Sequence, residues 1–340
     1  MKVLVTGGTG FVGSHVVARL VGQGHSVRLL VRDPAKLARV PKLRGVTVDD
    51  VCAGDVTDEA SVAQALDGCT HVVHAAAHVS LAERDADHVH AVNVGGTRLV
   101  VGSAAERKIP SVYVSSVSVF GVGHTSVTTA TPLTDGHAPY TESKVEAEQL
   151  VRDLQDRGAP IATVYPSGVL GPDSPDLSAN HVALIAWLRT PPRTTSGTSI
   201  VDVRDVARGI ERALEVPGRW MLGGHFLTWA ELHAALERVT RTRIRAVPMP
   251  AGVLRFAGRV GDVVKRVVPF EYPLTHEAMT MATRSCPYDS APTCETFDLV
   301  WRTVDSTLTD SIRWLAANQH ITAERAGALD GREPSKGAAS

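Results

Sequence analysis

The sequence has few of the patterns that mark secreted, metal-binding or membrane-spanning proteins. Its 340 residues include four cysteines, with no CxxC spacing and no metal-ligand pattern among the 14 histidines. We therefore expect no disulfide framework and no metal site, and the sparse thiols favour a reduced, cytoplasmic setting. No apolar run approaches the roughly 20 residues of a membrane span, and the N-terminal run is too short for a signal-peptide core.

An excess of charge of either sign is also absent. The 35 basic and 36 acidic residues leave a formal net charge of −1, so no overall field favours nucleic acid or an anionic membrane. Hydrophobic residues make up 44% and charged residues 21%, a balance that excludes a disordered or fibrous chain. At about 150 residues per domain, the length fits one large domain or two.

The first half of the chain alternates short β-branched runs with helical stretches. Strands are expected at Lys2–Thr6, Ser26–Arg32, Thr47–Cys52, His71–Ala75, Ser111–Ser115 and Ile161–Tyr165. Helices are expected between them at Phe11–Val21, Asp58–Leu66, His88–Glu106 and Tyr140–Asp156. Alternation at this spacing predicts an α/β fold with a doubly wound parallel sheet and helices on both faces.

The second half of the chain changes character after Tyr165. Residues 166–197 are rich in Pro, Ser and Thr, Ile200–Leu214 returns to a strand followed by a helix, and residues from 226 onward are mainly helical. We expect a nucleotide-binding domain over 1–165 with 199–225 returning to it, a smaller and mainly helical substrate domain over 166–198 and 226–330, and a mobile tail at 331–340.

Three glycines at a spacing of three lie between the first expected strand and the first expected helix. Gly7, Gly10 and Gly13 allow a tight turn, a close backbone approach to a pyrophosphate and close packing of helix on sheet. The helix start at Phe11 and Val12 offers free N–H groups and a positive dipole end to phosphates. In this strand–helix context the loop predicts a dinucleotide cofactor on a Rossmann sheet.

The end of the second strand bears on the choice between NADP and NAD. An acidic residue there binds the ribose 2′-hydroxyl, whereas an arginine suits a 2′-phosphate, and this chain has Arg32 with Arg39 beyond it. We therefore expect NADP. Two alternatives stay open: Arg32 as a solvated strand-end residue, or Asp33 turned toward the ribose of NAD, although Asp33-Pro34 suits a helix cap better.

Asp55 and Val56 follow the third strand and are candidate adenine contacts. The Asp55 carboxylate could accept a hydrogen bond from the adenine amino group, with Val56 beside the ring. The alternative is that Asp55 or Thr57 only caps the next helix.

Tyr140 and Lys144 form a Tyr-x-x-x-Lys pair at the start of a helix, on one helix face. A phenol with a pKa of about 10 is a poor acid–base catalyst at neutral pH, and a nearby ammonium or an oxidised nicotinamide ring favours its ionisation. Lys144 can also hydrogen-bond the nicotinamide ribose. Upstream, Ser115-Ser116 places a serine at the carboxyl edge of the sheet, where a hydroxyl can hold a substrate carbonyl. Each motif alone has an ordinary structural explanation; together, in this order, they predict a catalytic site.

With these motifs the chain resembles the extended short-chain dehydrogenase/reductase family, over residues 1 to about 215. The motifs are Thr6–Gly13, Gly54–Asp58, His74–Ala77, Asn93–Thr97, Ser115–Gly121, Tyr140–Lys144, Tyr165–Pro172 and Val201–Ala207. The resemblance implies that Tyr140 is the acid–base residue, that Lys144 lowers its pKa, and that Ser116 holds the carbonyl.

The resemblance also implies further contacts. It places Ala75, Ala76 and Ala77 against the cofactor and Pro166 near the nicotinamide carboxamide, and it gives Asn93 a structural role in holding the catalytic helix. The family often has an arginine before this proline. Here that residue is Tyr165, which leaves the role of the arginine in doubt.

Within the family, the chain looks most like the dihydroflavonol reductase and 3β-hydroxysteroid dehydrogenase branch. Dehydratases carry Asp-Glu after the catalytic Ser or Thr, and here the pair is Val117-Ser118. We expect an NADP-dependent oxidoreductase acting on a carbonyl of a small, apolar substrate. We expect no nucleic-acid partner and no membrane span, and a homodimer stays open.

Two other functions stay open. The first is an NAD-dependent nucleotide-sugar epimerase, for which a diphosphate could bind surface arginines; the candidates are Arg193, Arg204, Arg241, Arg243 and Arg245. The second is a non-catalytic NADP-binding regulator, against which the intact Ser-Tyr-Lys set argues. The apolar stretch Ala183–Leu188 indicates either a greasy pocket or a packed helix.

Residues 251–268 are expected to form an amphipathic helix. Its apolar stripe is Val253, Phe256, Ala257, Val260, Val264 and Val268, with Arg255, Arg259, Lys265 and Arg266 off the stripe. We expect the stripe to pack on the core. Contact with a membrane surface is the alternative.

Overall fold

Seven parallel strands form the main sheet of the computed structural model, which describes residues 1–48, 50–80, 83–136, 138–245, 251–265 and 276–330. In sheet order they are β3 (Asp50–Ala53), β2 (Ser26–Val31), β1 (Lys2–Thr6), β4 (His71–His74), β5 (Ser111–Val114), β6 (Ile161–Pro166) and β9 (Gly218–Leu222). The chain winds outward from β1 on one side and resumes at β4 on the other. This switch point between β1 and β4 is where open α/β sheets bind ligands, at the carboxyl ends of the strands.

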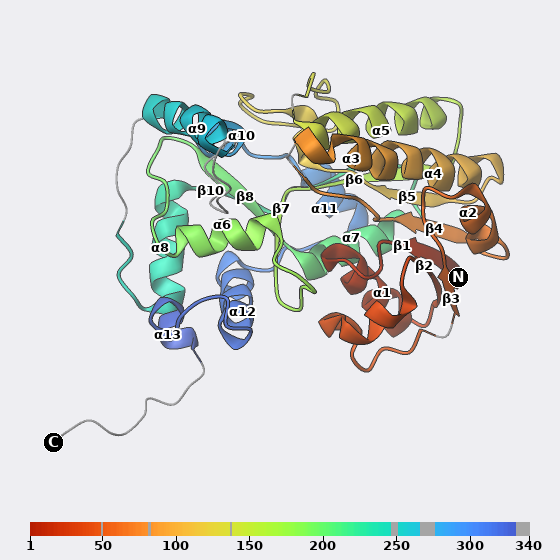
Figure 1. The fold of residues 1–340 in the computed structure, drawn as a ribbon, viewed down its shortest axis with the longest axis horizontal. Helices are drawn as coiled ribbons and strands as arrows, with labels where there is room; N and C mark the ends of the chain where they lie inside the picture. The colour runs from red at the N-terminus through yellow and green to blue at the C-terminus, as the bar shows by residue number, and fades with distance from the viewer. Residues whose placement is uncertain (49, 81–82, 137, 246–250, 266–275, 331–340) are drawn as a thin grey trace.

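Helices cover both faces of the main sheet because successive strand residues point to opposite sides. Val3 and Val5 pack against α1 (Phe11–Gly22) and α7 (Val203–Ala213), whereas Leu4 packs with α2 (Glu59–Leu66) and α4 (Gly96–Glu106). The catalytic helix predicted from the sequence is α5 (Pro139–Asp156), which lies beside α4 (Figure 1). The predicted doubly wound α/β fold is confirmed.

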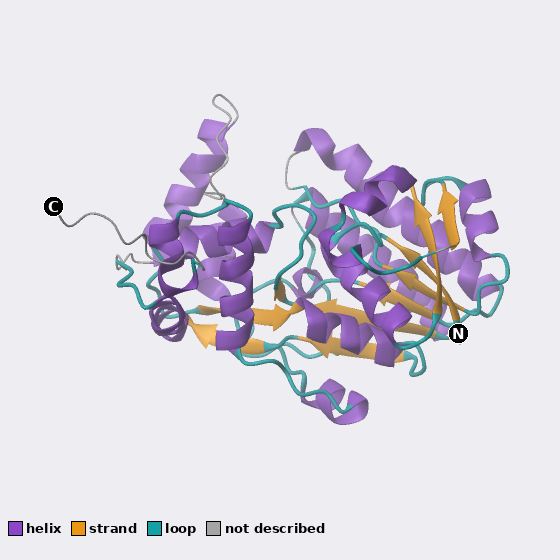
Figure 2. Cartoon of the chain, turned by 90° about the horizontal axis from the view of Figure 1, so that it is seen from below, coloured by secondary structure: helices purple, strands orange, loops and turns teal. Residues whose placement is uncertain are grey.

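A smaller sheet of three strands lies beside the main one (Figure 2). It contains β7 (Gly168–Leu170), β8 (Gly197–Asp202) and β10 (His225–Thr228), with β8 in the centre. Its apolar core includes residues of α6 (Ala179–Trp187), α8 (Trp229–Thr240) and α12 (Val304–Ala317). Leu184 and Leu188 are buried in this core, so the apolar stretch at 183–188 is a packed helix. The short helix α13 (Ala323–Ala326) contacts α12 and completes this half, whereas α11 (Ala291–Phe297) packs against α7 and β9 of the main sheet.

Several elements differ from the expected ranges. The strand expected at 47–52 begins only at Asp50. The strand expected near 200 is β8, which belongs to the small sheet. The strand that pairs with β6 in the main sheet is β9. The helix expected at 88–106 is α3 (Ala86–His90), a π-helical turn at Ala91–Gly95 and then α4. Such wide turns occur often at functional sites.

The amphipathic helix is α9 (Ala251–Lys265), which packs against α10 (His276–Arg284) with a different face from the one expected. Leu254 is buried at 5% exposure, while Val253, Phe256 and Val260 are 52%, 66% and 45% exposed. The expectation that the apolar stripe packs on the core is therefore wrong for these three residues. The side chain of residue 264, the rest of the stripe at 268 and the expected tail at 331–340 lie outside the described residues. Within the described part of the chain, no helix is long and apolar enough to cross a membrane.

Candidate active site

The glycine loop follows β1, and geometry requires glycine at two of its positions. Gly7 has a φ of +72°, and a Cβ there would lie 2.6 Å from the backbone of Ala75. A Cβ on Gly13 would collide with the carbonyl oxygen of Gly7, so only glycine lets α1 approach this closely. Gly10 caps α1 without a side-chain hydrogen bond, and the first turn holds no acidic residue. The N–H groups that begin α1 at Phe11 can therefore receive an anion such as a pyrophosphate.

The other expected cofactor contacts lie at the same edge of the sheet. Val12 lies in the first turn of α1, Val56 follows β3, residues Ala75, Ala76 and Ala77 continue from β4, and Pro166 ends β6. Ala76 is fixed next to the loop because its backbone N–H donates to Thr6 Oγ1 at 3.3 Å. The Phe11 ring packs on His181 of α6, with centroids 5.0 Å apart, and so links the glycine loop to the small-sheet half.

Arg32 lies directly after β2 and is exposed, with no ion pair in the described part of the chain. Asp33 accepts a hydrogen bond from Ala35 N at 3.0 Å and caps the 3-10 helix Pro34–Arg39. Lys36 and Arg39 on that helix also lack ion pairs among the described residues. The end of β2 therefore presents unpaired positive charge, while its one acid is used as a cap.

Asp55 forms a local turn. Its Oδ1 accepts hydrogen bonds from the backbone N and the hydroxyl of Thr57, both at 2.9 Å. The cap of α2 is Asp58, which accepts from Ser61 N at 2.8 Å. The alternative that Asp55 or Thr57 caps α2 is therefore wrong.

The catalytic residues expected from the sequence meet where β5 ends and α5 begins. Ser116 follows β5 and caps a 3-10 turn at Val117–Phe120, accepting a hydrogen bond from Ser118 N at 3.2 Å. Tyr140 lies in the first turn of α5, within hydrogen-bonding reach of Ser116. Burial raises the pKa of the Tyr140 phenol, and its hydrogen bond with Ser116 works against that rise. A phenol with a raised pKa carries its proton at neutral pH and can donate it.

Lys144 lies one turn further along α5 and is buried at 3% exposure. Burial lowers the pKa of its ammonium from 10.5 to about 8, and the negative charge of Glu148 opposes that change. Its Nζ donates to the backbone oxygen of Val114 at 2.8 Å and to Tyr113 Oη at 3.4 Å. The lysine is therefore anchored to the end of β5 while it stays on the same helix face as Tyr140.

Asn93, in the π-helical turn, joins α5 to the loop after β4. Its Nδ2 donates to Ser143 Oγ at 2.9 Å and to His78 O at 3.0 Å, and its Oδ1 accepts from His78 N at 2.8 Å. These contacts fit the structural role that the family resemblance implies for Asn93.

Tyr165 occupies the position where the family often has an arginine. Its hydroxyl donates to Glu148 Oε1 at 2.6 Å, and Arg152 Nε donates to the same oxygen at 2.9 Å. The guanidinium beside the buried Glu148 therefore comes from the next turn of α5. Position 165 thus holds a tyrosine in place of the arginine that the family often has, and the positive charge beside Glu148 is that of Arg152.

Sequence reasoning missed Tyr113 and Glu148 as neighbours of Lys144. Glu148 follows Lys144 at i+4, so the helical period alone places both on one face. Tyr113 lies in β5, two residues before Ser115. This spacing is a weaker indication, because it does not say which helix covers that face of the strand.

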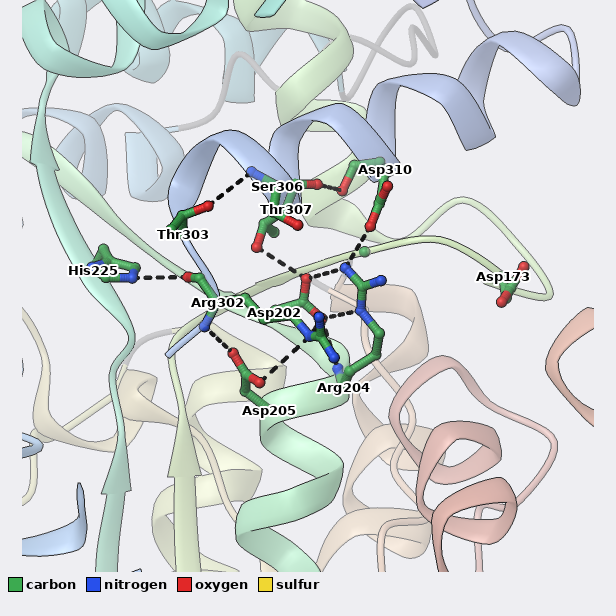
Figure 3. Close-up of polar contacts among 12 residues, drawn as sticks. Asp173, Asp202, Arg204, Asp205, His225, Arg302, Thr303, Ser306, Thr307 and Asp310 are labelled. Carbon is green, nitrogen blue, oxygen red and sulfur yellow. Dashed lines mark hydrogen bonds and ion pairs between the residues drawn. The ribbon is translucent and has the colours of Figure 1, made fainter. Parts of the chain in front are cut away.

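Arg204, a candidate diphosphate ligand, is instead the centre of a partly buried ion-pair network around the buried carboxylate of Asp202 (Figure 3). Its guanidinium donates to Asp202 at 2.7 and 2.8 Å and contacts Asp310 of α12 at 2.7 Å. Burial works to raise the pKa of Asp202, and the hydrogen bonds and charge of Arg204 together bring it below its usual value. Thr307 also donates to Asp202 at 2.9 Å. Arg204 joins β8 and α7 to α12, and its charge is already neutralised.

A glycine loop at the switch point and a Ser-Tyr-Lys set on the neighbouring strand and helix characterise one protein family. The model of the NAD dependent epimerase/dehydratase family matches residues 3–225. The chain belongs to this family. Like other members of the extended short-chain dehydrogenase/reductase group, it is an NAD(P)-dependent oxidoreductase that uses a nicotinamide dinucleotide.

Relatives within the family include named reductases. A putative dihydroflavonol 4-reductase of Synechocystis sp. is 28% identical over 331 residues, covering 93% of this chain and 95% of the relative. Cinnamoyl-CoA reductase 1 of Oryza sativa subsp. japonica is 34% identical over 262 residues, covering 70% of this chain and 75% of the relative. The crystal structure of gox2253 superposes with a TM-score of 0.78 at 27% identity, covering 94% of this chain and 99% of the other.

Proposed function

We propose that the protein is an NADP-dependent reductase that converts the carbonyl of a small, apolar ketone or aldehyde to an alcohol, or catalyses the matching oxidation. The observation that carries this proposal is the placement of Ser116, Tyr140 and Lys144 at the carboxyl edge of the sheet that holds the glycine loop. Similarity to a putative dihydroflavonol 4-reductase and a cinnamoyl-CoA reductase supports the reductive direction.

The side chains divide the chemistry as follows. The reduced cofactor, when bound, supplies the hydride to the carbonyl carbon. Ser116 donates a hydrogen bond to the carbonyl oxygen, and Tyr140 gives that oxygen its proton. The phenol of Tyr140 has this proton to give because its raised pKa keeps it protonated at neutral pH. The ammonium of Lys144 favours the phenolate that remains.

The preference for NADP rests on the charge at the end of β2. Arg32 is exposed and unpaired among the described residues, Lys36 and Arg39 add positive charge nearby, and Asp33 is used as a helix cap. A guanidinium pairs with phosphate oxygens through two parallel hydrogen bonds, which suits a 2′-phosphate.

The test is a turnover assay with purified protein, NADPH and a panel of apolar ketones and aldehydes. A reductase consumes NADPH one for one with product, and Tyr140→Phe should lower kcat by roughly 10²–10⁴-fold while NADPH affinity stays nearly intact. Near-normal turnover in this variant would contradict the role of Tyr140.

Two other outcomes would replace the proposal. A nucleotide-sugar epimerase would carry tightly bound NAD and interconvert UDP-sugars with no net change in nicotinamide absorbance. The engagement of Arg204 with Asp202 and Asp310 removes one of its candidate diphosphate ligands. A non-catalytic regulator would bind NADPH and never consume it.

A further inference from the structure

The buried ammonium of Lys144 is held by neutral groups. It forms no ion pair with any residue that the structure describes, although burial strongly penalises its charge. Besides the backbone oxygen of Val114, its neighbour is Tyr113, whose hydroxyl lies 3.4 Å from Nζ and whose ring centre lies 4.9 Å away. Both the hydroxyl oxygen and the ring face attract a cation.

Tyr113 is itself buried next to Thr97. The residue is 1% exposed, and burial raises the pKa of its phenol well above the usual value, while the Thr97 hydroxyl works against that rise. Thr97 Oγ1 donates its own proton to the backbone oxygen of Asn93 at 2.6 Å. Because the proton of Thr97 is used there, its oxygen can only accept from the Tyr113 hydroxyl, and the lone pairs of the phenol are left for Lys144.

His74 extends this series of hydrogen-bonded side chains toward the glycine loop. Its Nε2 lies 3.2 Å from Thr97 Oγ1, and because that oxygen already donates elsewhere, Nε2 carries the proton. Its Nδ1 then accepts from Thr6 Oγ1 at 2.8 Å, and Thr6 Oγ1 accepts from Ala76 N at 3.3 Å. Burial, helped by the charge of Lys144, lowers the pKa of His74 to about 3, so the ring stays neutral in this arrangement.

We propose that Tyr113 is a positioning residue for Lys144, and that the buried chain Thr6–His74–Thr97–Tyr113 sets the orientation of its hydroxyl. Val114 and Tyr113 take two of the three N–H groups of the ammonium, which leaves one for the cofactor and Tyr140. This series of hydrogen-bonded side chains starts at the backbone of Ala76 beside the glycine loop. It therefore fixes the lysine relative to the part of the site expected to hold the cofactor. The role of this arrangement in catalysis rests on the proposed reductase function. The positioning of Lys144 by Tyr113 does not rest on that function.

The direct test is the titration of Lys144 in the full chain, followed by NMR of [13Cε]lysine. The chain has seven lysines, and a Lys144→Arg variant identifies the signal. The groups facing this ammonium are Glu148 and Tyr140 on its own helix, Tyr113 on β5 and His74 on β4. Wild-type Lys144 should titrate near a pKa of about 8.

The Tyr113→Phe variant keeps the ring and removes the hydroxyl that accepts from the ammonium. The Lys144 midpoint should fall by roughly half to one pH unit. A matched pair at Thr97 tests the rest of the chain: Thr97→Val removes the oxygen at nearly constant shape and should move the midpoint downward, whereas Thr97→Ser keeps the oxygen and should restore it. Tyr288→Phe, which removes the hydroxyl of a partly buried phenol from the neighbouring apolar cluster around Phe120 and Tyr165, should leave it unchanged.

Turnover gives an independent readout. Reduction requires the ammonium, so the alkaline limb of the kcat/KM profile should move to lower pH in Tyr113→Phe and in Thr97→Val, by the same amount as the NMR midpoint. An unchanged Lys144 midpoint in a folded Tyr113→Phe or Thr97→Val variant would overturn the positioning role. Displaced midpoints in a protein that never consumes NADPH would support the positioning role and overturn the reductase proposal.

Discussion

Burial sets the pKa values of the two residues expected to act on the proton, Tyr140 and Lys144. Tyr140 and Lys144 have pKa values moved in opposite directions by the same cause, since burial disfavours the charged form of each. The tyrosine keeps its proton, and the lysine is brought closer to losing its own. Tyr140 can therefore act as the proton donor and Lys144 as its electrostatic partner. The surroundings that give them these roles are neutral groups and one buried carboxylate, Glu148.

Cofactor choice is a residue-scale prediction. Replacing Arg32 with Asp should weaken NADPH binding by roughly 10- to 100-fold, because a carboxylate repels the 2′-phosphate, and NADH should become the tighter ligand. Dissociation constants measured by fluorescence titration check this. The control is Arg44→Asp, the same charge change at another exposed arginine, which should leave the order of the two cofactors unchanged.

A second residue-scale prediction concerns acid stability. Burial lowers the pKa of His74 from 6.5 to about 3, so between these values the unfolded chain binds a proton that the folded chain does not. The free energy of unfolding should therefore fall as pH drops below 6.5, by about 2–3 kcal/mol at pH 4.5 from this group alone. His15, with a pKa of about 4, contributes in the same sense.

Urea unfolding at a series of pH values measures this effect. A His74→Gln variant should show a shallower loss of stability between pH 6.5 and 4.5, while His233→Gln, at a partly exposed position, should follow the wild type. Identical losses of stability in His74→Gln and the wild type would mean that His74 is not neutral in the folded protein.

Elements of the fold differ in how far the sequence predicts them. The strands of the main sheet follow from β-branched runs, and the glycine loop and Tyr140/Lys144 follow from spacing, because each depends on neighbours within one or two turns. The small sheet does not, since β7 has only three residues, too few to show a pattern of its own. The periodicity of 251–268 locates an apolar stripe but not the helix face that docks, which was the error at Phe256.

The docking face of α9 can be tested with a matched pair. Leu254→Ser removes a buried side chain and should lower the free energy of unfolding by about 2–4 kcal/mol, whereas Phe256→Ser should change it by no more than about 0.5 kcal/mol because Phe256 is 66% exposed. Urea unfolding of both variants gives the comparison. Equal costs would show that the stripe containing Phe256 is packed after all.

At the scale of the whole molecule, Asp202 connects an element of the main-sheet half, α7, to two elements of the small-sheet half, β8 and α12. This carboxylate has no exposed side-chain surface and receives hydrogen bonds from Arg204 of α7 and from Thr307 of α12, so these elements share one buried charge. No sequence pattern predicts that partnership, because the motif Val201–Ala207 specifies Arg204 next to Asp202 but not the distant residues Asp310 and Thr307.

Removing the positive partner should therefore be costly. Arg204→Met leaves Asp202 buried without its main counter-charge and should destabilise the fold by about 3–5 kcal/mol. Arg208→Met, four residues further along α7, loses only a surface contact with the backbone of Asp298 and should cost less than about 1 kcal/mol. Chemical denaturation of the two variants provides the measurement, and comparable losses would argue against a central role for Arg204.

The distance along the chain between these partners has a consequence for synthesis. Asp202 and Thr307 are 105 residues apart. At roughly 5–20 residues per second, the ribosome needs about 5–20 s to add the second after the first. During that interval the nascent chain has already exposed β1 to β6 and the glycine loop, while Asp202 lacks its later contacts. The nucleotide-binding sheet can therefore form while the chain is still being translated, whereas the small-sheet half must wait until α12 has left the exit tunnel.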